Sequence, residues 1–412
     1  MKIAVWYNLP SGGGKRALYN YVRGLAERGH AIESWCPSTA DRSYLPLSDL
    51  VPEHVLPLPW TPEGRRNFLL SRAYGATRDR LRRMDRHCRE CAEEINCGGF
   101  DLLFANPCMF FSSGAIARYI RIPSVLYLQD PFRQLYEALP KLRWVALDTP
   151  RGWWRSPNFL ARRFADFLKI EGMRVQAREE LRNAQAFSSI LVNSYYSRES
   201  VLRAYGLDSK VCYLGVDTNL FVNQGRPREF FVVGIGSFTP GKGIDFAIRA
   251  VGQLQPPRPR LIWIGNASER GYLEFLTRLS QSQGVEFEPK LMIQDSEMAD
   301  ILNRASIMVY APRLEPFGLA ALEGNACGLP VVAVAEGGVR ETVVDGVNGL
   351  LVEHDPQRMA AAIQYLIDRP DCAAQLGANG RRMVLERWTV QHSVERLEQR
   401  FIELMQRGNA SQ

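Results

Sequence analysis

Long apolar segments are missing from this chain of 412 residues. No stretch approaches the roughly 18 uninterrupted apolar residues that a membrane-spanning helix needs. The first residues, MKIAVWYNLPSGGGKR, also lack the apolar core of a secretory signal. We therefore expect a cytoplasmic protein, and association with the inner face of a membrane stays open. The 46% apolar content is enough for two or three ordinary domain cores.

Cysteine is sparse as well. The eight cysteines are scattered along the chain, which excludes a fold built on disulfides. One dense stretch, HCRECAEEINC at residues 87–97, has a Cys-x-x-Cys spacing beside a histidine that would suit zinc. It has no second pair and lies in an arginine-rich segment typical of a helix, so packing explains it better. We predict no metal site.

Acidic residues are scarce relative to basic ones in the first half of the chain, whereas the second half is nearly balanced. Lys and Arg outnumber Asp and Glu by 31 to 22 in residues 1–222, against 20 to 22 in residues 223–412. Residues 65–89 hold nine arginines, and residues 141–174 interleave Trp144, Trp153 and Trp154 with basic groups. This pattern suits an anionic membrane, stacked bases or a solvated basic face. Because no nucleic-acid-binding module is recognisable, we expect no nucleic-acid partner.

Short β-branched or aromatic runs alternate with helix-like segments throughout. The runs fall at residues 2–7, 31–36, 101–106, 124–129, 189–194 and 211–216, then at 230–236, 260–266, 285–289, 307–312, 330–336 and 349–355. This alternation is typical of parallel sheets covered by helices. It predicts an α/β fold with two doubly wound, Rossmann-like domains, residues 1–215 and 216–390. We expect the helix at 391–412 to cross back to the first domain.

Three glycine-rich turns follow predicted strands, where backbone N–H groups can approach an anion. In GIGSFTPGKGID, residues 234–245, Gly236 and Ser237 precede Lys242, a cation suited to phosphate. A nucleoside-triphosphatase P-loop requires Ser or Thr where Gly243 stands, so an ATPase is disfavoured. Tight strand-to-helix connections would explain such turns equally well when each is taken alone.

The other two turns are equally short. PSGGGKRAL, residues 10–18, carries Gly12, Gly13 and Gly14 without the order of a dinucleotide-binding fingerprint, so NAD is weakly supported. AEGGVRETVVDGVNG, residues 335–349, has Gly337 and Gly338. In both segments the glycines mark a turn within a loop, and either turn could face a sugar or an anion.

The segment EPFGLAALE, residues 315–323, sets a glutamate at each end of an apolar stretch. We expect its helix to begin near Phe317, with Glu315 in the loop before it and Glu323 about 8 Å along the axis. The N–H groups of Phe317, Gly318 and Leu319 then join the other second-domain turns at strand carboxyl ends, where they can converge on one diphosphate. At that distance Glu323 suits ribose hydroxyls, and Glu315 faces the other side of the diphosphate.

The order of GGGKRAL, GKG, EPFGLAALE, GLPVVA and GGVRETVVDGVNGLLV resembles family 4 of the retaining, nucleotide-sugar-dependent glycosyltransferases. The resemblance implies the GT-B fold, in which two Rossmann-like domains face each other across a cleft. It implies an acceptor-binding first domain and a second domain that binds a UDP- or GDP-linked sugar, with no resident cofactor or metal. Glu323 would bind the ribose, Glu315 the transferred sugar, and Lys242 would neutralise the diphosphate leaving group.

The resemblance assigns a full set of site residues. Lys242, Glu315 and Gln129 are the predicted catalytic residues. The predicted donor contacts are Gly236, Ser237, Lys242, Glu315, Phe317, Gly318, Leu319, Glu323, Gly337 and Gly338, and the predicted acceptor contacts are Gly12, Gly13, Gly14, Asp130 and Arg133. Ser237 stands where family members commonly carry an arginine, and Gln129 where many carry a histidine. Arg313 or Arg340 could supply the missing cation.

The sequence therefore predicts metal-independent, retaining transfer of a sugar to a hydroxyl of a saccharide, lipid-linked or small-molecule acceptor. Two other classes stay open. One is a GT-B epimerase or phosphorylase. The other is a glycan- or lipid-binding protein without activity, left by the changes at Ser237 and Gln129.

Overall fold

The computed structural model describes residues 1–58, 76–136, 152 and 156–410. Residue contacts divide the chain into a first unit, residues 1–192, 198–211 and 398–412, and a second unit, residues 193–197 and 212–397. The sequence predicts a second domain at residues 216–390, whereas the second unit runs from residue 212 to residue 397 and also includes residues 193–197. Part of the predicted Trp–Arg stretch lies outside the described residues, including Trp144, Trp153 and Trp154. Arg65, Arg66 and Arg72 of the arginine-rich segment also lie outside them.

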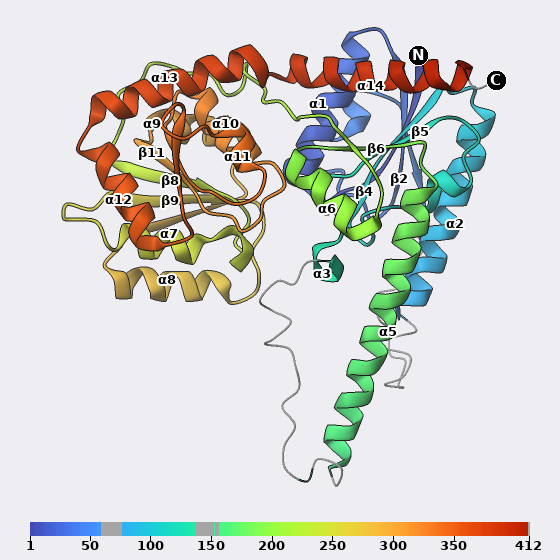
Figure 1. The fold of residues 1–412 in the computed structure, drawn as a ribbon, viewed down its shortest axis with the longest axis horizontal. Helices are drawn as coiled ribbons and strands as arrows, with labels where there is room; N and C mark the ends of the chain where they lie inside the picture. Colours follow the sequence, from blue (N-terminus) through green and yellow to red (C-terminus); the bar gives the residue numbers. More distant parts are fainter. Residues whose placement is uncertain (59–75, 137–151, 153–155, 411–412) are drawn as a thin grey trace. The chain divides into compact units, whose positions relative to one another are not determined.

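The first unit is built on one seven-stranded sheet in the order β3-β2-β1-β4-β5-β6-β7 (Figure 1). All of its strand pairs are parallel. Its strands are β1 (Lys2–Asn8), β2 (Ala31–Pro37), β3 (Glu53–Leu56), β4 (Leu102–Cys108), β5 (Ser124–Tyr127), β6 (Ser189–Val192) and β7 (Lys210–Val211). The predicted runs are confirmed, except that only Val211 of the last run lies in a strand, β7, and that β3 was missed.

Helices cover both faces of this sheet because its strands present apolar side chains on both sides. On one face, Trp6 and Leu103 pack with α2 (Ala76–Cys97), the 3₁₀ turn η3 (Ala115–Arg118), the end of α5 (Pro157–Gln185) and α6 (Tyr195–Tyr205). On the other face, the ring of Phe104 lies 6.2 Å from that of Tyr21 in α1 (Gly13–Glu27) and 5.3 Å from that of Phe401 in α14 (Val390–Ala410). The 3₁₀ turn η1 (Leu47–Asp49) and the short helix α3 (Arg133–Tyr136) lie in connections.

Helix α5 has 29 residues, and its two halves differ. It starts at Ser156, whose hydroxyl accepts a hydrogen bond from the N–H of Phe159 at 3.4 Å. Its buried residues all lie from Gly172 onward, where the helix packs on the unit. The half before Gly172 extends away from the sheet (Figure 1). Within the described residues, no helix is long and apolar enough to cross a membrane.

The second unit holds a six-stranded parallel sheet in the order β10-β9-β8-β11-β12-β13. Its strands are β8 (Phe231–Ile235), β9 (Arg260–Gly265), β10 (Phe287–Leu291), β11 (Ile307–Tyr310), β12 (Val331–Val334) and β13 (Gly349–Val352). Its helices are η5 (Pro240–Lys242), α7 (Ile244–Val251), α8 (Tyr272–Gln283), α9 (Asp295–Arg304), α10 (Leu319–Ala326), α11 (Val339–Thr342), α12 (Pro356–Ile367) and α13 (Pro370–Arg387). All six predicted strands of this half are confirmed.

In each sheet the strand order reverses beside the first strand of that sheet. β1 lies between β2 and β4, and β8 lies between β9 and β11. The loops that leave two such neighbouring strands go to opposite faces of the sheet, so a crevice forms at their carboxyl ends, and ligands of doubly wound sheets bind there. Of the three glycine turns singled out in the sequence, two follow β1 and β8 and the third follows β12, while the two-glutamate segment follows β11.

Candidate functional site

Lys242 and Glu315 meet in the second unit at this reversal point. The ammonium Nζ of Lys242 lies 2.8 Å from Oε2 of Glu315, although 73 residues separate them in the sequence. Lys242 ends the 3₁₀ turn η5 after β8, and its stem lies over Gly236, where an added Cβ would be 3.2 Å from its side chain. Both side chains keep part of their surface exposed, so a ligand can reach this cation and this carboxylate together.

The Gly337–Gly338 turn packs directly on the backbone of the two-glutamate segment. A Cβ at Gly337 would lie 2.3 Å from the carbonyl oxygen of Glu315, and one at Gly338 would lie 2.1 Å from that of Pro316. The N–H of Gly338 donates to the carbonyl of Glu315 at 2.8 Å. Because this N–H already has a partner, the turn supports the loop of Glu315. That Gly337 and Gly338 contact the donor stays a prediction.

Helix α10 begins at Leu319, two residues later than predicted, with Gly318 before it in the left-handed region at φ 96°. Glu323 is the fifth residue of this helix. It therefore lies about 6 Å along the axis from the first residue, rather than 8 Å. Glu323 is buried, with 5% of its surface exposed.

Tyr310, at the carboxyl end of β11, links the two glutamates. The pKa of its phenol is raised well above the ordinary value, first by burial and then by the negative charges of Glu315 and Glu323. Both carboxylates are therefore near one phenol. Glu315 is partly accessible and Glu323 is enclosed. That the two serve different parts of one ligand stays a prediction.

Phe317 fixes the loop between Glu315 and α10 through its buried side chain. Its ring is 6.1 Å from that of Tyr213 and 5.8 Å from that of Trp388, and the rings of Tyr213 and Trp388 are 5.0 Å apart. The ring thus anchors the loop in the core of the unit, and only the backbone of Phe317 is left for a ligand.

A short segment at residues 194–196 supports the same loop from a distant part of the chain. The hydroxyl of Ser194 donates to the carbonyl of Pro316, which lies 122 residues further on. The carboxylate of Glu341, in α11, accepts from the N–H groups of Tyr195 and Tyr196 at 3.0 and 3.1 Å and from the hydroxyl of Tyr213 at 2.9 Å. Sequence reasoning missed these residues because no local pattern marks a contact over such separations.

The two arginines named as substitute cations each have a partner in the second unit. The guanidinium of Arg313 is 2.7 Å from a carboxylate oxygen of Glu336, and that of Arg340 donates to the carbonyl of Gly337 at 3.1 Å. Ser237 directly follows Gly236 and is partly buried. Of these residues, Lys242 is the one paired with Glu315, and the role of Arg313 or Arg340 as a further cation stays a prediction.

The predicted acceptor residues also come together, within the first unit. A Cβ at Gly14 would lie 3.0 Å from the side-chain nitrogen of Gln129, so the turn that starts α1 touches the loop after β5. Gly12 precedes α1 at φ 140°, in a conformation that favours glycine. Asp130 and Arg133 form an ion pair at 3.3 Å. The turn and the loop after β5 make one polar surface at strand carboxyl ends.

Lys15 was not singled out from the sequence, yet it lies fully buried in the first turn of α1. Its Nζ sits 3.9 Å from the centre of the Tyr7 ring and has no hydrogen-bond partner among the described residues. Burial lowers the pKa of this ammonium to about 8, against the opposing charges of Glu53, Cys36 and Asp41. A cation–π contact in a dry site therefore holds the helix that carries the glycine turn.

Glu180 is a second buried charge that the sequence did not reveal. It lies on α5, fully buried, and accepts hydrogen bonds from Gln176 at 2.9 Å and from the hydroxyl of Tyr205 at 3.2 Å. Burial raises the pKa of its carboxyl from 4.5 to about 7, although both hydrogen bonds oppose the shift. The folded state therefore binds this proton more tightly than the unfolded chain does.

We expect Glu180→Gln to flatten the pH dependence of stability. Because the folded pKa is raised, this carboxyl contributes stability below pH 4.5 that is lost as the pH rises to about 7. A shift of this size corresponds to about 3 kcal/mol. Urea unfolding at pH 5 and pH 8 should show a smaller difference for Glu180→Gln than for the unchanged protein. The exposed Glu199→Gln serves as the control, and equal pH differences in all three proteins would contradict the assignment.

The cysteine-rich stretch lies in α2 and is largely core. His87, Cys88 and Cys91 are buried, and the Nε2 of His87 is 3.4 Å from both the indole nitrogen of Trp6 and the Sγ of Cys91. In the part of the chain that the structure describes, no three His, Cys, Asp or Glu side chains are grouped to hold a metal ion.

Two parallel α/β units with polar clusters at their strand carboxyl ends define a two-domain ligand-binding protein of the GT-B class. The sequence profile "Glycosyltransferase Family 4" matches residues 11–220, just over half of the chain, and "Glycosyl transferases group 1" matches residues 216–383. The chain belongs to glycosyltransferase family 4.

Characterised relatives match over part of their length. D-inositol 3-phosphate glycosyltransferase 1 of Catenulispora acidiphila is 34% identical over an alignment 213 residues long, which covers 45% of this chain and 50% of that protein. Alpha-maltose-1-phosphate synthase of Mycolicibacterium smegmatis is 28% identical over 261 residues, 54% of this chain and 65% of that protein. The chain thus spans about half the length of the first of these and about two thirds of the second.

Solved structures match over nearly the whole chain. The Anabaena protein Alr3699/HepE in complex with UDP has a TM-score of 0.69 at 20% identity, covering 98% of this chain and 100% of that one. Sucrose-phosphate synthase from Thermosynechococcus elongatus has a TM-score of 0.69 at 19% identity, covering 98% and 99%. At these identities the likeness concerns the fold, and it supports GT-B.

Proposed function

We propose that this protein is a retaining glycosyltransferase that moves a sugar from a nucleoside diphosphate sugar to an acceptor hydroxyl, in the synthesis of a glycan, glycolipid or polysaccharide. The observation that carries the proposal is the contact between Lys242 and Glu315 at the carboxyl ends of β8 and β11, in a chain of glycosyltransferase family 4. A cation and a carboxylate at this place can hold a diphosphate and a sugar side by side.

The nucleotide end of the donor is assigned to Glu323. Its place on α10, about 6 Å from the start of the helix, suits hydrogen bonds to ribose hydroxyls, and the start of the helix is assigned to the diphosphate, since helix N-termini bind anions. Alr3699/HepE was solved with UDP and with UDP-glucose, which favours a uridine-linked donor over a guanosine-linked one.

Lys242 exchanges one partner for another when the donor binds. In the structure its ammonium pairs with Glu315. A diphosphate carries more negative charge than one carboxylate, so it draws Lys242 away and leaves Glu315 to accept hydrogen bonds from the sugar hydroxyls. In this proposal the bond from the anomeric carbon to the diphosphate breaks, and the bond to the acceptor oxygen forms on the same face. The departing phosphate takes the acceptor's proton, so the protein positions the groups and stabilises charge.

Gln129, Asp130, Arg133 and the Gly12–Gly14 turn are the proposed acceptor contacts. Their grouping within the first unit supports this role, and a saccharide, a lipid-linked sugar or a small polyol would fit such a polar surface. A cytoplasmic location, at the inner face of a membrane when the acceptor is lipid-linked, belongs to the same proposal. Gln129 is included among the catalytic residues because it occupies the position beside the reacting sugar that the family resemblance assigns.

A panel of radiolabelled UDP- and GDP-sugars with mixed acceptors tests the proposal. We expect one donor to give transfer with the anomeric configuration kept, as read by nuclear magnetic resonance, at an undiminished rate in excess chelator. The chelator arm tests the predicted independence from metal, for which Lys242 supplies the neutralising charge. Lys242→Ala should lose most turnover, while Lys290→Ala should keep it. The control is matched, because both lysines pair with a glutamate at 2.8 Å and are similarly exposed.

The alternatives predict other products. An isomerised sugar nucleotide indicates an epimerase, and a sugar 1-phosphate formed from inorganic phosphate indicates a phosphorylase. Donor binding without any product indicates a glycan- or lipid-binding protein that has lost catalysis. Transfer abolished by chelator and restored by a divalent ion would overturn the metal-independent mechanism.

A further inference from the structure

Exposed apolar side chains are concentrated on the first half of α5. Of the sixteen large hydrophobic residues that are exposed in the described chain, four lie within residues 160–170. These are Leu160, Phe164, Phe167 and Ile170, with 42%, 49%, 53% and 40% of their surface exposed. Soluble proteins scatter such residues singly, and a contiguous group marks a surface that something else covers.

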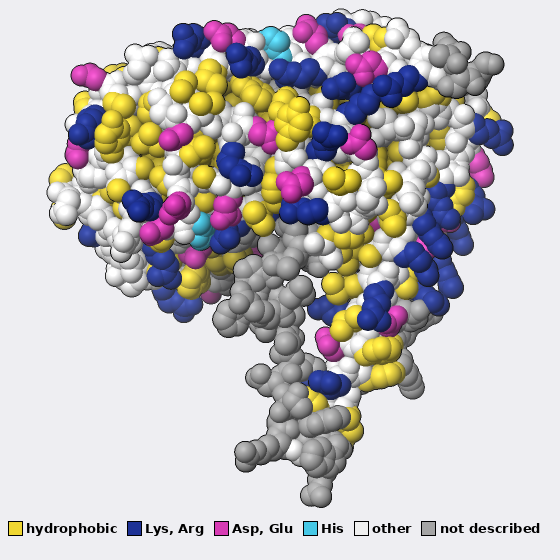
Figure 2. Space-filling model, in the orientation of Figure 1, with side chains coloured by type: hydrophobic (Ala, Val, Ile, Leu, Met, Phe, Trp, Pro, Cys, Tyr) yellow, Lys and Arg dark blue, Asp and Glu magenta, His cyan; other side chains and the backbone are white. Residues whose placement is uncertain are grey.

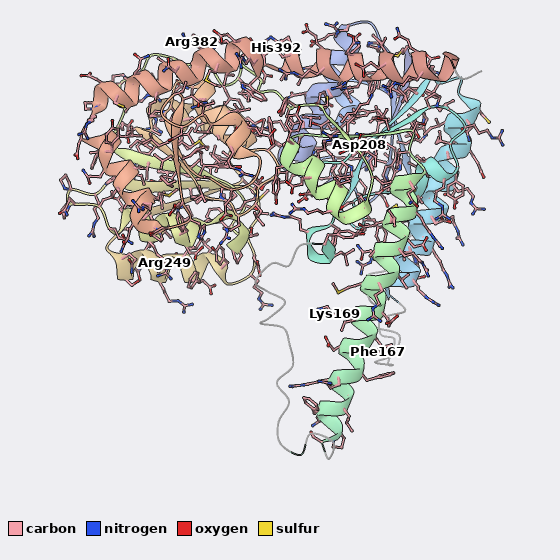
Figure 3. The ribbon with its side chains drawn as sticks, in the orientation of Figure 1. Phe167, Lys169, Asp208, Arg249, Arg382 and His392 are labelled. Carbon is pink, nitrogen blue, oxygen red and sulfur yellow. The ribbon has the colours of Figure 1, made fainter. Side chains whose placement is uncertain are left out.

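The four side chains form one stripe. A helix turns by about 100° per residue, so these four positions fall within an arc of about 120°, which the partly buried Leu168 extends and which also contains the exposed Arg163. Arg162 and Lys169 lie on the opposite side, about 180° to 200° from Leu160. Both are exposed, and the one acid on that side is Asp166. We call Leu160, Phe164, Phe167 and Ile170 the apolar stripe. Figure 3 labels Phe167 and Lys169 on this half of the helix.

An arginine-lined hollow continues the same side of α5 toward the body of the unit. It has a volume of about 340 Å³ and lies between α2 and α5, and the arginines that line it are Arg78, Arg82, Arg118 and Arg178. Asp85 and Glu179 are its two acids. Arg178 follows Leu160 by eighteen residues, which is five full turns, so both point the same way. Figure 2 shows dark blue side chains gathered over α2 and yellow ones along the projecting half of α5.

We propose that the first unit docks on an anionic lipid bilayer through α5, with the apolar stripe in the acyl boundary and the arginines of the hollow on lipid phosphates. Exposed aromatic and aliphatic residues on a helix that also carries basic side chains suit a membrane interface, where the stem of Arg163 can lie along the apolar groups while its charge reaches the head groups. Basic groups beside it add attraction to anionic head groups. The excess of basic residues in the first half of the chain has the sign that this partner requires.

A second copy of this chain is the main competing occupant. Two-fold symmetry would bring the arginine-lined hollow near its own copy, where like charges repel. A nucleic acid would be attracted by the arginines, but it would leave the apolar stripe in water. The bilayer satisfies both features at once, and this docking does not depend on the proposed sugar transfer.

Flotation with vesicles tests the docking, using the full chain without donor. Vesicles of phosphatidylcholine alone are compared with vesicles that also contain phosphatidylglycerol. We expect binding to the anionic vesicles to fall as salt rises, because screening shortens the reach of charge from about 10 Å at 0.1 M to about 3 Å at 1 M. The double change Phe164→Glu with Phe167→Glu should weaken binding at least tenfold, a factor worth about 1.4 kcal/mol.

Two further variants make the result specific. Leu202→Glu replaces an equally exposed apolar residue, 56% exposed on α6, and should bind as the unchanged protein does. Arg78→Glu with Arg82→Glu should lose the preference for anionic lipid. Circular dichroism checks that each variant is folded. The substituted side chains are exposed, so their replacement removes no core packing.

Several outcomes would overturn the proposal. One is equal binding to neutral and anionic vesicles, and another is retained binding by the double phenylalanine variant. The third is a dimer of the unchanged protein that forms without lipid and that the double phenylalanine variant fails to form. Because vesicle binding is scored without turnover, a negative result here leaves the transfer assay untouched, and a failed transfer assay leaves this result untouched.

Discussion

Glu323→Ala should weaken binding of both the donor and the free nucleoside diphosphate by roughly ten- to a hundredfold. Hydrogen bonds to a charged group are worth about 1.5–3 kcal/mol each, and this buried carboxylate is assigned to the ribose that both ligands share. Calorimetric titration with UDP measures the loss. Glu323→Gln keeps the shape of the buried side chain and should lose less affinity, which separates the hydrogen bonds from a packing defect.

Glu315→Ala should behave differently, because this residue is assigned to the transferred sugar alone. Affinity for UDP should stay nearly intact, while turnover falls, since a sugar that is held loosely leaves its reactive pose. Removing Glu315 also takes a partner from Lys242, so UDP binding could rise but should not fall. Equal loss of UDP affinity in both variants, or no loss in either, would show that the two acids do not serve opposite ends of one donor.

Gly338→Ala should damage the site without touching any charged residue. The added Cβ would lie 2.1 Å from the carbonyl oxygen of Pro316 and 2.9 Å from the Cα of Phe317, and both are backbone atoms that cannot rotate away. The loop that carries Glu315 must shift, at a cost of about 1–3 kcal/mol in the free energy of unfolding. We expect a lower melting temperature and weaker UDP binding together, measured by calorimetry.

Gly241→Ala is the matched control for this collision. Gly241 lies in the neighbouring turn η5, and a Cβ there would meet nothing within 4 Å. Its stability should change by no more than about 0.5 kcal/mol, as for surface substitutions in general. A Gly338→Ala protein as stable as Gly241→Ala would mean that the loop yields easily and that Glu315 is not rigidly placed.

The fold could be predicted where strands are apolar on both faces. Buried parallel strands such as β8, β9 and β12 appear as continuous β-branched runs, so sequence alone locates them. β3, with its sequence EHVL, lies at the sheet edge and is only partly buried, so it carries no such run. The expected strand at 211–216 is mostly a connection into the second unit, where Val216 bridges to Thr389 instead.

The grouping of residues at the candidate site was predictable as far as it depends on turn chemistry and strand ends. Those rules brought Lys242, Glu315 and the glycine turn to one sheet edge, and the contact at 2.8 Å agrees. Those rules could not predict which hydrogen bond each group makes. The N–H of Gly338 proved to be a support for the loop, and Ser194, Tyr213 and Glu341 act over long sequence separations. Lys15 and Glu180 are buried charges whose surroundings only the folded chain defines.

Residues 193–197 have a practical consequence for dissecting this chain. They belong to the second unit, although the flanking segments belong to the first. A fragment cut at residue 212 would therefore lack the hydroxyl that bonds Pro316 and two of the N–H groups that bond Glu341. Such a piece would retain every residue assigned to the nucleotide sugar and still lose part of the scaffold that holds them. The two halves are thus not modular in the way that a single cut in the sequence suggests.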